Sequence, residues 1–154
     1  MIAVHAISRY FSIYRALSGR EQKVLLASLV LLPAFWVGLR LAGLQRFQVW
    51  LDRFPITQSP PLSQAEAAAL GLAVNRAANH VFCGGSCLTR SLLLRWLLRR
   101  FGTASDLRIG VCFDEGKLLA HAWVEQKGVL LNDRPEVLAR YAVFDRPIAP
   151  EMFS

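Results

Sequence analysis

Residues 83–102, CGGSCLTRSLLLRWLLRRFG, contain the pattern that decides the fold of this chain. Two adjacent glycines break any preceding helix and allow a tight turn just before Cys87. From Cys87 to about Phe101, the leucines and Trp96 fall on one broad apolar stripe, and the arginines lie largely off it. Gly102 is a natural stop for such a helix. The stretch therefore predicts an amphipathic helix that carries a cysteine in its first turn.

After this helix the apolar period changes to two, which indicates strands. Alternation over residues 107–113 predicts a first strand, and residues 114–117 (DEGK) predict a turn. Two further strands are expected over 118–126 and 129–132, and residues 137–144 add a short helix or strand. Because helices come first and an antiparallel sheet follows, the fold class is α+β.

The residues before the cysteine helix divide into a hydrophobic segment, a linker and a further helix. Residues 55–63 are rich in proline and serine, which is typical of a linker. Ser63 followed by Glu66 is a capping-box pair, which predicts a helix from there to about Val81. The sequence thus predicts two parts, a hydrophobic helical segment over 1–54 and the main domain over 63–154.

The hydrophobic segment is uncharged from Val24 to Leu39 and is interrupted by Pro33. It is shorter than the roughly 20 apolar residues that span a bilayer. We therefore expect a buried or interfacial helical hairpin broken near Pro33, in preference to a spanning helix. The tryptophans and arginines that follow suit a membrane-surface face, a partner-docking face and an ordinary amphipathic helix equally well.

The bulk composition sets limits on the class of protein. A chain of 154 residues with 54% hydrophobic residues suffices for one domain with a real core and is not disordered. The formal net charge is +7, with the excess concentrated in the first 80 residues. A solubilising basic face, contact with anionic lipid and contact with an acidic peptide are all compatible with it. No nucleic acid partner is expected, because no basic stripe is interleaved with aromatic residues.

The chain has three cysteines, at positions 83, 87 and 112, and no secretory signal pattern. An odd count of this kind predicts a reducing compartment, the cytoplasm, and the hydrophobic segment leaves membrane association open. A zinc site from His80, Cys83 and Cys87 would lack a fourth ligand at the usual spacing. The sequence therefore predicts neither a metal site nor a cofactor.

Cys87 is the candidate nucleophile, because a thiol attacks only as a thiolate. Free backbone N–H groups and the positive end of the macrodipole favour that anion in the first turn of a helix. The N–H of Cys87 is also placed to donate to an oxyanion, and the preceding glycines let a substrate backbone approach closely. The alternative is that Cys87 is a small buried residue at a helix start. Cys83 and Cys112 are best interpreted as structural residues, since Cys83 precedes the glycines and Cys112 lies within a strand.

A thiolate needs a base, and the base needs a group that orients it. Of the three histidines, His5 lies near the terminus and His80 fits an exposed helix end. His121 lies within LLAHAWVEQ, between two alanines that leave room for a substrate or for the cysteine helix. We therefore predict that His121 is the base.

Asp133 is the candidate orienting group, and the hairpin before it offers a geometric test. A three-residue loop over 126–128 pairs His121 with Asp133 on one face of the sheet. A two-residue loop pairs Ala122 with Asp133 and turns His121 to the other face. The mechanism therefore predicts the three-residue loop. Trp123 shares the His121 face, where it borders the substrate cleft or is a core tryptophan.

Several spaced motifs together resemble a known family. CLTRSLLLRWLLRRFG, LRIGV, AHAWVE, LLND and RY follow one another over residues 63–144, most densely over 87–133. The order of a cysteine at a helix start, a histidine on a strand and an aspartate on the next resembles the transglutaminase-like superfamily of papain-like folds. More narrowly, the motifs look like the leader peptidases of lasso-peptide biosynthesis, similar to the C-terminal region of microcin-processing proteins.

The resemblance implies a function. Cys87 matches the nucleophile, His121 the base and Asp133 the third member of a cysteine peptidase that removes the leader from a ribosomally made precursor. It implies a separate winged-helix protein that recognises the leader and an ATP-dependent, asparagine-synthetase-like cyclase as partners. The competing hypotheses are another acyltransferase or amidase on the same fold, and a non-catalytic, membrane-associated scaffold.

Overall fold

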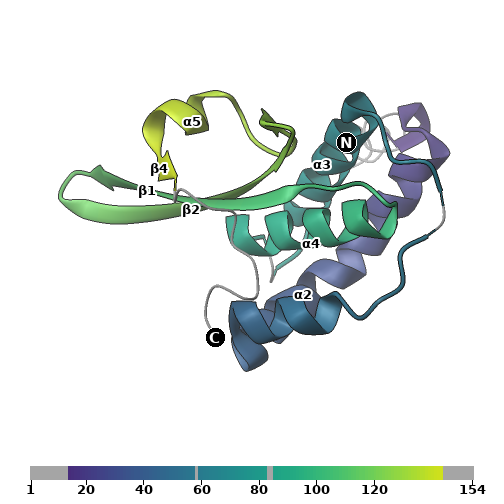
Figure 1. The fold of residues 1–154 in the computed structure, drawn as a ribbon, viewed down its shortest axis with the longest axis horizontal. Helices are drawn as coiled ribbons and strands as arrows, with labels where there is room; N and C mark the ends of the chain where they lie inside the picture. The colour runs from purple at the N-terminus through teal and green to yellow at the C-terminus, as the bar shows by residue number, and fades with distance from the viewer. Residues whose placement is uncertain (1–13, 58, 83–84, 144–154) are drawn as a thin grey trace, which may run out of the picture.

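The computed structural model describes residues 14–57, 59–82 and 85–143, which form an α+β domain, so the expected fold class is confirmed (Figure 1). Within the described residues, long helices lie between Gly19 and Arg100, and an antiparallel sheet follows. The elements are α2 (Gly19–Leu51), α3 (Gln64–Ala78), α4 (Cys87–Arg100), β1 (Asp106–Asp114), β2 (Lys117–Gln126), β3 (Val129–Leu130), α5 (Glu136–Arg140) and β4 (Ala142–Val143).

The sheet has the strand order β3-β2-β1-β4, with every neighbouring pair antiparallel. Figure 1 shows α4 along one side of the sheet and α5 beyond the other side. The leucines of α4 are buried in one core with Ala122 and Val124 of β2. The Ser91 Oγ of α4 donates to the Ala122 carbonyl at 3.0 Å, which ties the helix directly to the strand that carries His121.

Both expected helix starts are confirmed. The Ser63 hydroxyl accepts from the Glu66 N–H, and the Glu66 carboxylate accepts from the Ser63 N–H, which completes the predicted capping box of α3. This helix ends at Ala78 and is capped by Asn79, slightly earlier than expected. Helix α4 begins at Cys87, as the sequence pattern requires.

The break in the hydrophobic segment lies at Gly43 and not near Pro33, so that expectation was wrong. Pro33 lies inside α2, and the helix continues through it. Gly43 has φ 74° and ψ 167°, a backbone conformation that side chains disfavour. The chain turns there and folds back, so that the Phe47 ring packs edge-on against Phe35 at 5.2 Å.

Helix α2 packs against the rest of the domain. Val24, Leu32 and Phe35 are buried in the same core as α3 and α4. An ion pair from Arg20 to Glu66 at 2.9 Å links α2 with α3, and one from Arg99 to Asp52 at 3.3 Å links α4 with the end of α2. The helix therefore shares one core with the sheet-bearing part of the chain.

The hairpin between β2 and β3 has a two-residue loop, so the expected three-residue loop was wrong. Gln126 pairs with Val129 and Glu125 with Leu130. The loop residues Lys127 and Gly128 both have positive φ, 50° and 80°. This is the tight turn whose twist matches that of the flanking strands.

Candidate active site

Cys87 occupies the first position of α4. The Ser86 side chain caps the helix by accepting from the Thr89 N–H at 3.2 Å. Cys87 carries a free, half-buried thiol. Its sulfur therefore lies at the positive end of a 14-residue helix, where a thiolate is stabilised.

His121 and Asp133 form a direct side-chain contact. The His121 Nε2 lies 2.6 Å from the Asp133 Oδ2, and both side chains keep about a fifth of their surface exposed. The other Asp133 oxygen accepts from the Arg134 N–H at 2.9 Å, which fixes the carboxylate plane. Since Nε2 faces the carboxylate, Nδ1 is the ring nitrogen left to exchange a proton with a thiol.

This contact forms although the hairpin has the register expected to prevent it. Regular pairing of β3 ends at Leu130, and the Leu131 N–H still donates to the Val124 carbonyl at 2.9 Å. One step further, the Val124 N–H donates to the Asn132 side chain at 2.9 Å. The backbone has therefore left the regular ladder before Asp133, and the carboxylate is free to turn toward His121.

Asn132 anchors this irregular segment to three elements. Its Nδ2 donates to the Ser91 Oγ of α4 at 2.9 Å, while its Oδ1 accepts from β2. Its own carbonyl accepts from the Asn75 side chain of α3 at 2.8 Å. Asn132 is buried, so these bonds are made away from water and position the neighbouring Asp133.

Tyr141 covers the other side of the histidine. Its ring lies 5.2 Å from the His121 ring at an angle of 30°. Gly110, the β1 partner of His121, makes this possible, because a Cβ at Gly110 would lie 2.9 Å from the Tyr141 Cβ. The imidazole is therefore bonded to a carboxylate at its edge and stacked against an aromatic ring on its face.

Tyr141 also neighbours a thiol, that of Cys112. Burial raises the pKa of the Tyr141 hydroxyl, and the neighbouring Cys112 thiol, through its charge and a hydrogen bond, raises that pKa further. Arg140 lowers this pKa, and the charge of Cys87 raises it slightly. The hydroxyl of the side chain that stacks on His121 therefore has a raised pKa, chiefly because of burial and of Cys112.

Trp123 lies on the His121 face, as expected, but it does not border an open cleft. The two rings are stacked 6.1 Å apart, and Trp123 is 0% exposed. Its indole N–H donates to the Glu125 carboxylate at 2.8 Å, and Arg108 pairs with the same group at 3.2 Å. The Trp123 side chain is therefore packed within the domain, as the core interpretation expects, and its contact with substrate stays a prediction.

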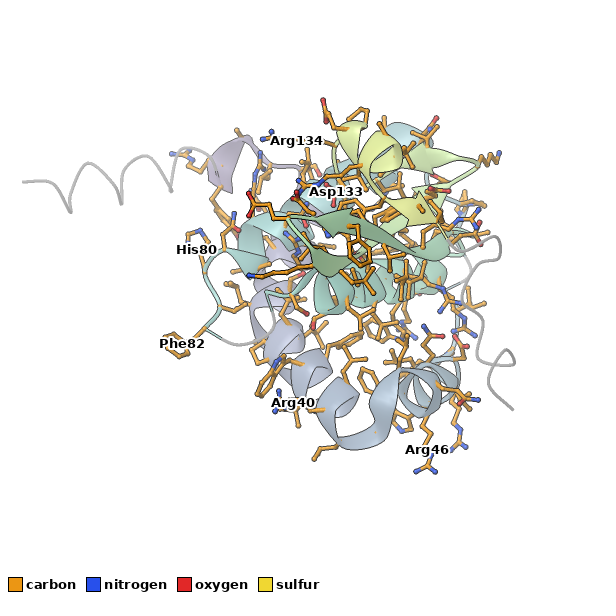
Figure 2. All side chains as sticks on the ribbon, turned by 90° about the vertical axis from the view of Figure 1, so that its left-hand side faces the viewer. Arg40, Arg46, His80, Phe82, Asp133 and Arg134 are labelled. Carbon is orange, nitrogen blue, oxygen red and sulfur yellow. The ribbon has the colours of Figure 1, made fainter. Side chains whose placement is uncertain are left out.

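The described cysteines and histidines form no metal-ligand set. Among the residues that the structure describes, no three His, Cys, Asp or Glu side chains come together as a metal site would require. Cys83, the middle member of the zinc arrangement considered above, lies outside the described residues. His80 is exposed beyond the end of α3, and Figure 2 shows it well away from Asp133.

Two residues of the site carried no role in the sequence-based prediction. Asn132 belongs to the LLND motif and Tyr141 to the RY motif, so both residues were part of the resemblance to the family. Their roles depend on contacts between residues far apart in the chain, Asn132 with Ser91 and Tyr141 with His121. No local spacing signals such contacts.

The arrangement as a whole defines a class. A cysteine in the first turn of a helix, on a sheet that carries a hydrogen-bonded histidine and aspartate, is the arrangement expected of thiol-dependent acyl-transfer folds. A family model described as the transglutaminase-like superfamily matches residues 29–145. The chain therefore belongs to the transglutaminase-like superfamily, which includes cysteine peptidases and acyltransferases. No curated protein and no solved structure matches the chain.

Proposed function

We propose that this protein is a cysteine peptidase that removes the leader from a ribosomally made lasso-peptide precursor. Cys87 is the nucleophile, His121 the base and Asp133 the group that orients the histidine. The observation that carries the proposal is the 2.6 Å hydrogen bond between His121 and Asp133, on a sheet packed against the helix that begins at Cys87. That is the pairing a catalytic histidine needs.

The proposed chemistry is acyl transfer through a thioester. The His121 Nδ1 takes the Cys87 proton, and the thiolate attacks the scissile carbonyl at the last leader residue. Collapse of the tetrahedral intermediate breaks the peptide bond, and His121 gives the proton to the departing core amine. Water, deprotonated by His121, then attacks the thioester and releases the leader carboxylate, and the proton returns to the thiolate. Asp133 stabilises the imidazolium that forms twice in this cycle.

The substrate class rests on the spaced motifs that contain these residues, from CLTRS to RY, which resemble those of leader peptidases. On this proposal, a separate winged-helix protein presents the leader, and an ATP-dependent, asparagine-synthetase-like cyclase consumes the freed amine. The enzyme acts in the reducing cytoplasm, where a thiol nucleophile stays unoxidised.

The first test replaces the nucleophile. Cys87→Ala should abolish cleavage of the precursor, because no other group supplies the attacking sulfur. Cys112→Ser is the matched control, since it removes the second described thiol and keeps a hydroxyl for the contact with Tyr141; it should retain most of the rate. Precursor cleavage is followed by mass spectrometry. Cleavage by Cys87→Ala at the parent rate would disprove the assignment.

The same assay separates the competing hypotheses. A leader that carries an added amine in place of a free carboxylate would identify a transglutaminase or another amine-accepting acyltransferase. A non-catalytic scaffold predicts that a thiol-reactive probe labels Cys87 and Cys112 equally slowly. The peptidase proposal requires faster labelling of Cys87, because the helix terminus favours its thiolate.

A further inference from the structure

One face of the first limb of α2 is apolar and exposed along its whole length. Exposed side chains recur at helical spacing, and Val30 and Leu41 keep 73% and 84% of their surface accessible. The opposite face is buried against the domain. The exposed stripe, here called the α2 stripe, consists of Leu26, Val30, Ala34, Val37 and Leu41.

The apolar surface continues past the elbow at Gly43. Val49 and Trp50 on the second limb are about half exposed. Between the two limbs lies an apolar cavity of about 350 Å³, lined by aromatic rings that include Phe35 and Phe47. An exposed apolar surface that extends over two helical limbs is larger than the scattered hydrophobic residues of an ordinary soluble surface.

The charged residues of α2 between Val24 and Leu51 are all of one sign. Between Val24 and Leu51 the charged residues are Arg40 and Arg46, and both are exposed. The Arg40 guanidinium lies 5.1 Å from the centre of the Trp36 ring, so its apolar stem and a tryptophan face the same region. Figure 2 shows Arg40 and Arg46 at the end of the molecule opposite Asp133.

We propose that the α2 stripe docks on the surface of an anionic phospholipid bilayer, with Arg40 and Arg46 at the level of the headgroups. Exposed leucine and valine side chains enter the acyl boundary, and the two arginines pair with lipid phosphates. Charge complementarity selects this occupant, because α2 between Val24 and Leu51 offers cations and apolar groups without an acidic side chain. The pose leaves the side that carries Asp133 facing away from the membrane.

The structure favours a docked helix over a spanning one. Helix α2 is long and apolar enough to cross a membrane by length and composition, and 22% of its most apolar window is buried. The buried part includes Val24, Leu32 and Phe35, which pack on α3 and α4. A spanning pose would require the helix to leave this core and break the contacts of Arg20 and Arg99.

The apolar arm of the test compares exposed apolar side chains on two helices, a pair on α2 and one leucine on α3. The full chain is sedimented with vesicles of phosphatidylcholine alone and of phosphatidylcholine mixed with phosphatidylglycerol. The parent should bind the mixed vesicles selectively. The double variant Val30→Gln with Leu41→Gln should weaken that binding at least tenfold, because it removes two inserted side chains. Leu72→Gln, at an α3 position that is 54% exposed, should change binding less than twofold.

The charge arm uses arginines at opposite ends of the molecule. Arg40→Gln and Arg46→Gln should each weaken binding to the mixed vesicles about fivefold, and together about 30-fold. The reason is that each arginine near an anionic surface contributes about a fivefold gain in binding affinity. Arg134→Gln removes the same charge at the Asp133 end and should have little effect. Added salt should release the parent protein from the vesicles.

Three results would overturn the proposal. Equal binding to neutral and mixed vesicles would remove the role of the arginines. Retention on the vesicles after washing with high salt and alkaline carbonate would indicate a spanning helix. A change in oligomeric state caused by Val30→Gln with Leu41→Gln without lipid would assign the stripe to a second copy of this chain. Cleavage of a soluble precursor by the stripe variants is measured separately, so loss of docking and failure of the peptidase proposal are distinguishable.

Discussion

His121 is held from three sides by residues that come from different parts of the chain. Asp133 binds its Nε2, Tyr141 stacks on one face and Trp123 lies next to it along the strand. A ring held in this way has one orientation, with Nδ1 directed away from the carboxylate. On the proposed mechanism, the residues around the histidine thus leave Nδ1 as the nitrogen that accepts the thiol proton.

Asp133→Asn tests this orientation. The amide can donate to Nε2 and so favours the tautomer with its proton on Nδ1, which cannot accept a proton from the thiol. We expect kcat/KM for precursor cleavage to fall by about 10²- to 10⁴-fold. Asp106→Asn, an exposed aspartate at the start of β1, is the control and should keep the parent rate. An unchanged rate in Asp133→Asn, with the fold intact by circular dichroism, would remove Asp133 from the mechanism.

At the scale of the element, helix ends were predictable and the helix break was not. Ser63 and Glu66 form their capping box within four residues, so the local sequence contains both partners. Pro33 removes one backbone donor, yet α2 continues because its flanking turns are packed against α3 and α4. Gly43 bends the helix because the Phe47 ring then packs on the first limb, next to Gly38.

The capping box of α3 makes a pH-dependent contribution to stability. Hydrogen bonds from the Ser63 backbone and side chain lower the pKa of Glu66 below its usual 4.5, with a smaller effect from Arg20. A carboxyl with a lowered pKa in the folded state stabilises the protein above about pH 4.5, and this contribution is lost as the pH falls through the lowered pKa.

Glu66→Gln should therefore lower the unfolding temperature at neutral pH, and the difference from the parent should shrink below pH 4.5. Glu115→Gln, in the exposed turn between β1 and β2, is the control and should leave the unfolding temperature unchanged at both pH values. Thermal denaturation followed by circular dichroism measures both. A difference that stays constant across this range would show that the carboxylate charge contributes nothing.

At the scale of the whole molecule, Asn132 connects three elements through buried hydrogen bonds. A side-chain amide of α3 donates to the Asn132 carbonyl, and a hydroxyl of α4 accepts from the Asn132 side-chain amide. A backbone N–H of β2 donates to the Asn132 Oδ1. The helix that carries Cys87 and the segment that carries Asp133 are therefore held together by the hydrogen bonds of this one residue. Packing of the α4 leucines on Ala122 and Val124 closes the same interface from the apolar side.

Asn132→Ala should remove the side-chain hydrogen bonds that link α4 and β2 to this segment. The Val124 N–H loses its partner in a buried position, which costs roughly 1–3 kcal/mol of unfolding free energy. Because Asp133 follows directly, kcat/KM should fall by more than the loss of folded protein explains. Asn79→Ala, at the exposed end of α3, is the control and should cost less. Urea denaturation gives the free energy, and cleavage assays in the folded range give the rate. A rate equal to the parent would separate Asn132 from the site.

The sequence alone determined the elements and the order of the reactive groups. The helix start at Cys87, the Ser63 cap and the alternation of β1 and β2 are local patterns, and each lies where the pattern predicts. These features depend on interactions within one helical turn or between neighbouring strand positions. Such interactions are the same in any fold, so the amino-acid order is sufficient to recognise them.

Only the tertiary structure decided how Asp133 reaches His121. The turn preference of Lys127 and Gly128 set a register that would point the two residues to opposite faces of a regular sheet. The contact exists because Asn132 replaces the backbone as the partner of Val124 and lets the chain leave the sheet one residue early. That exchange depends on Ser91 and Asn75, which lie far from Asn132 in the sequence, and long-range packing of this kind leaves no trace in local spacing.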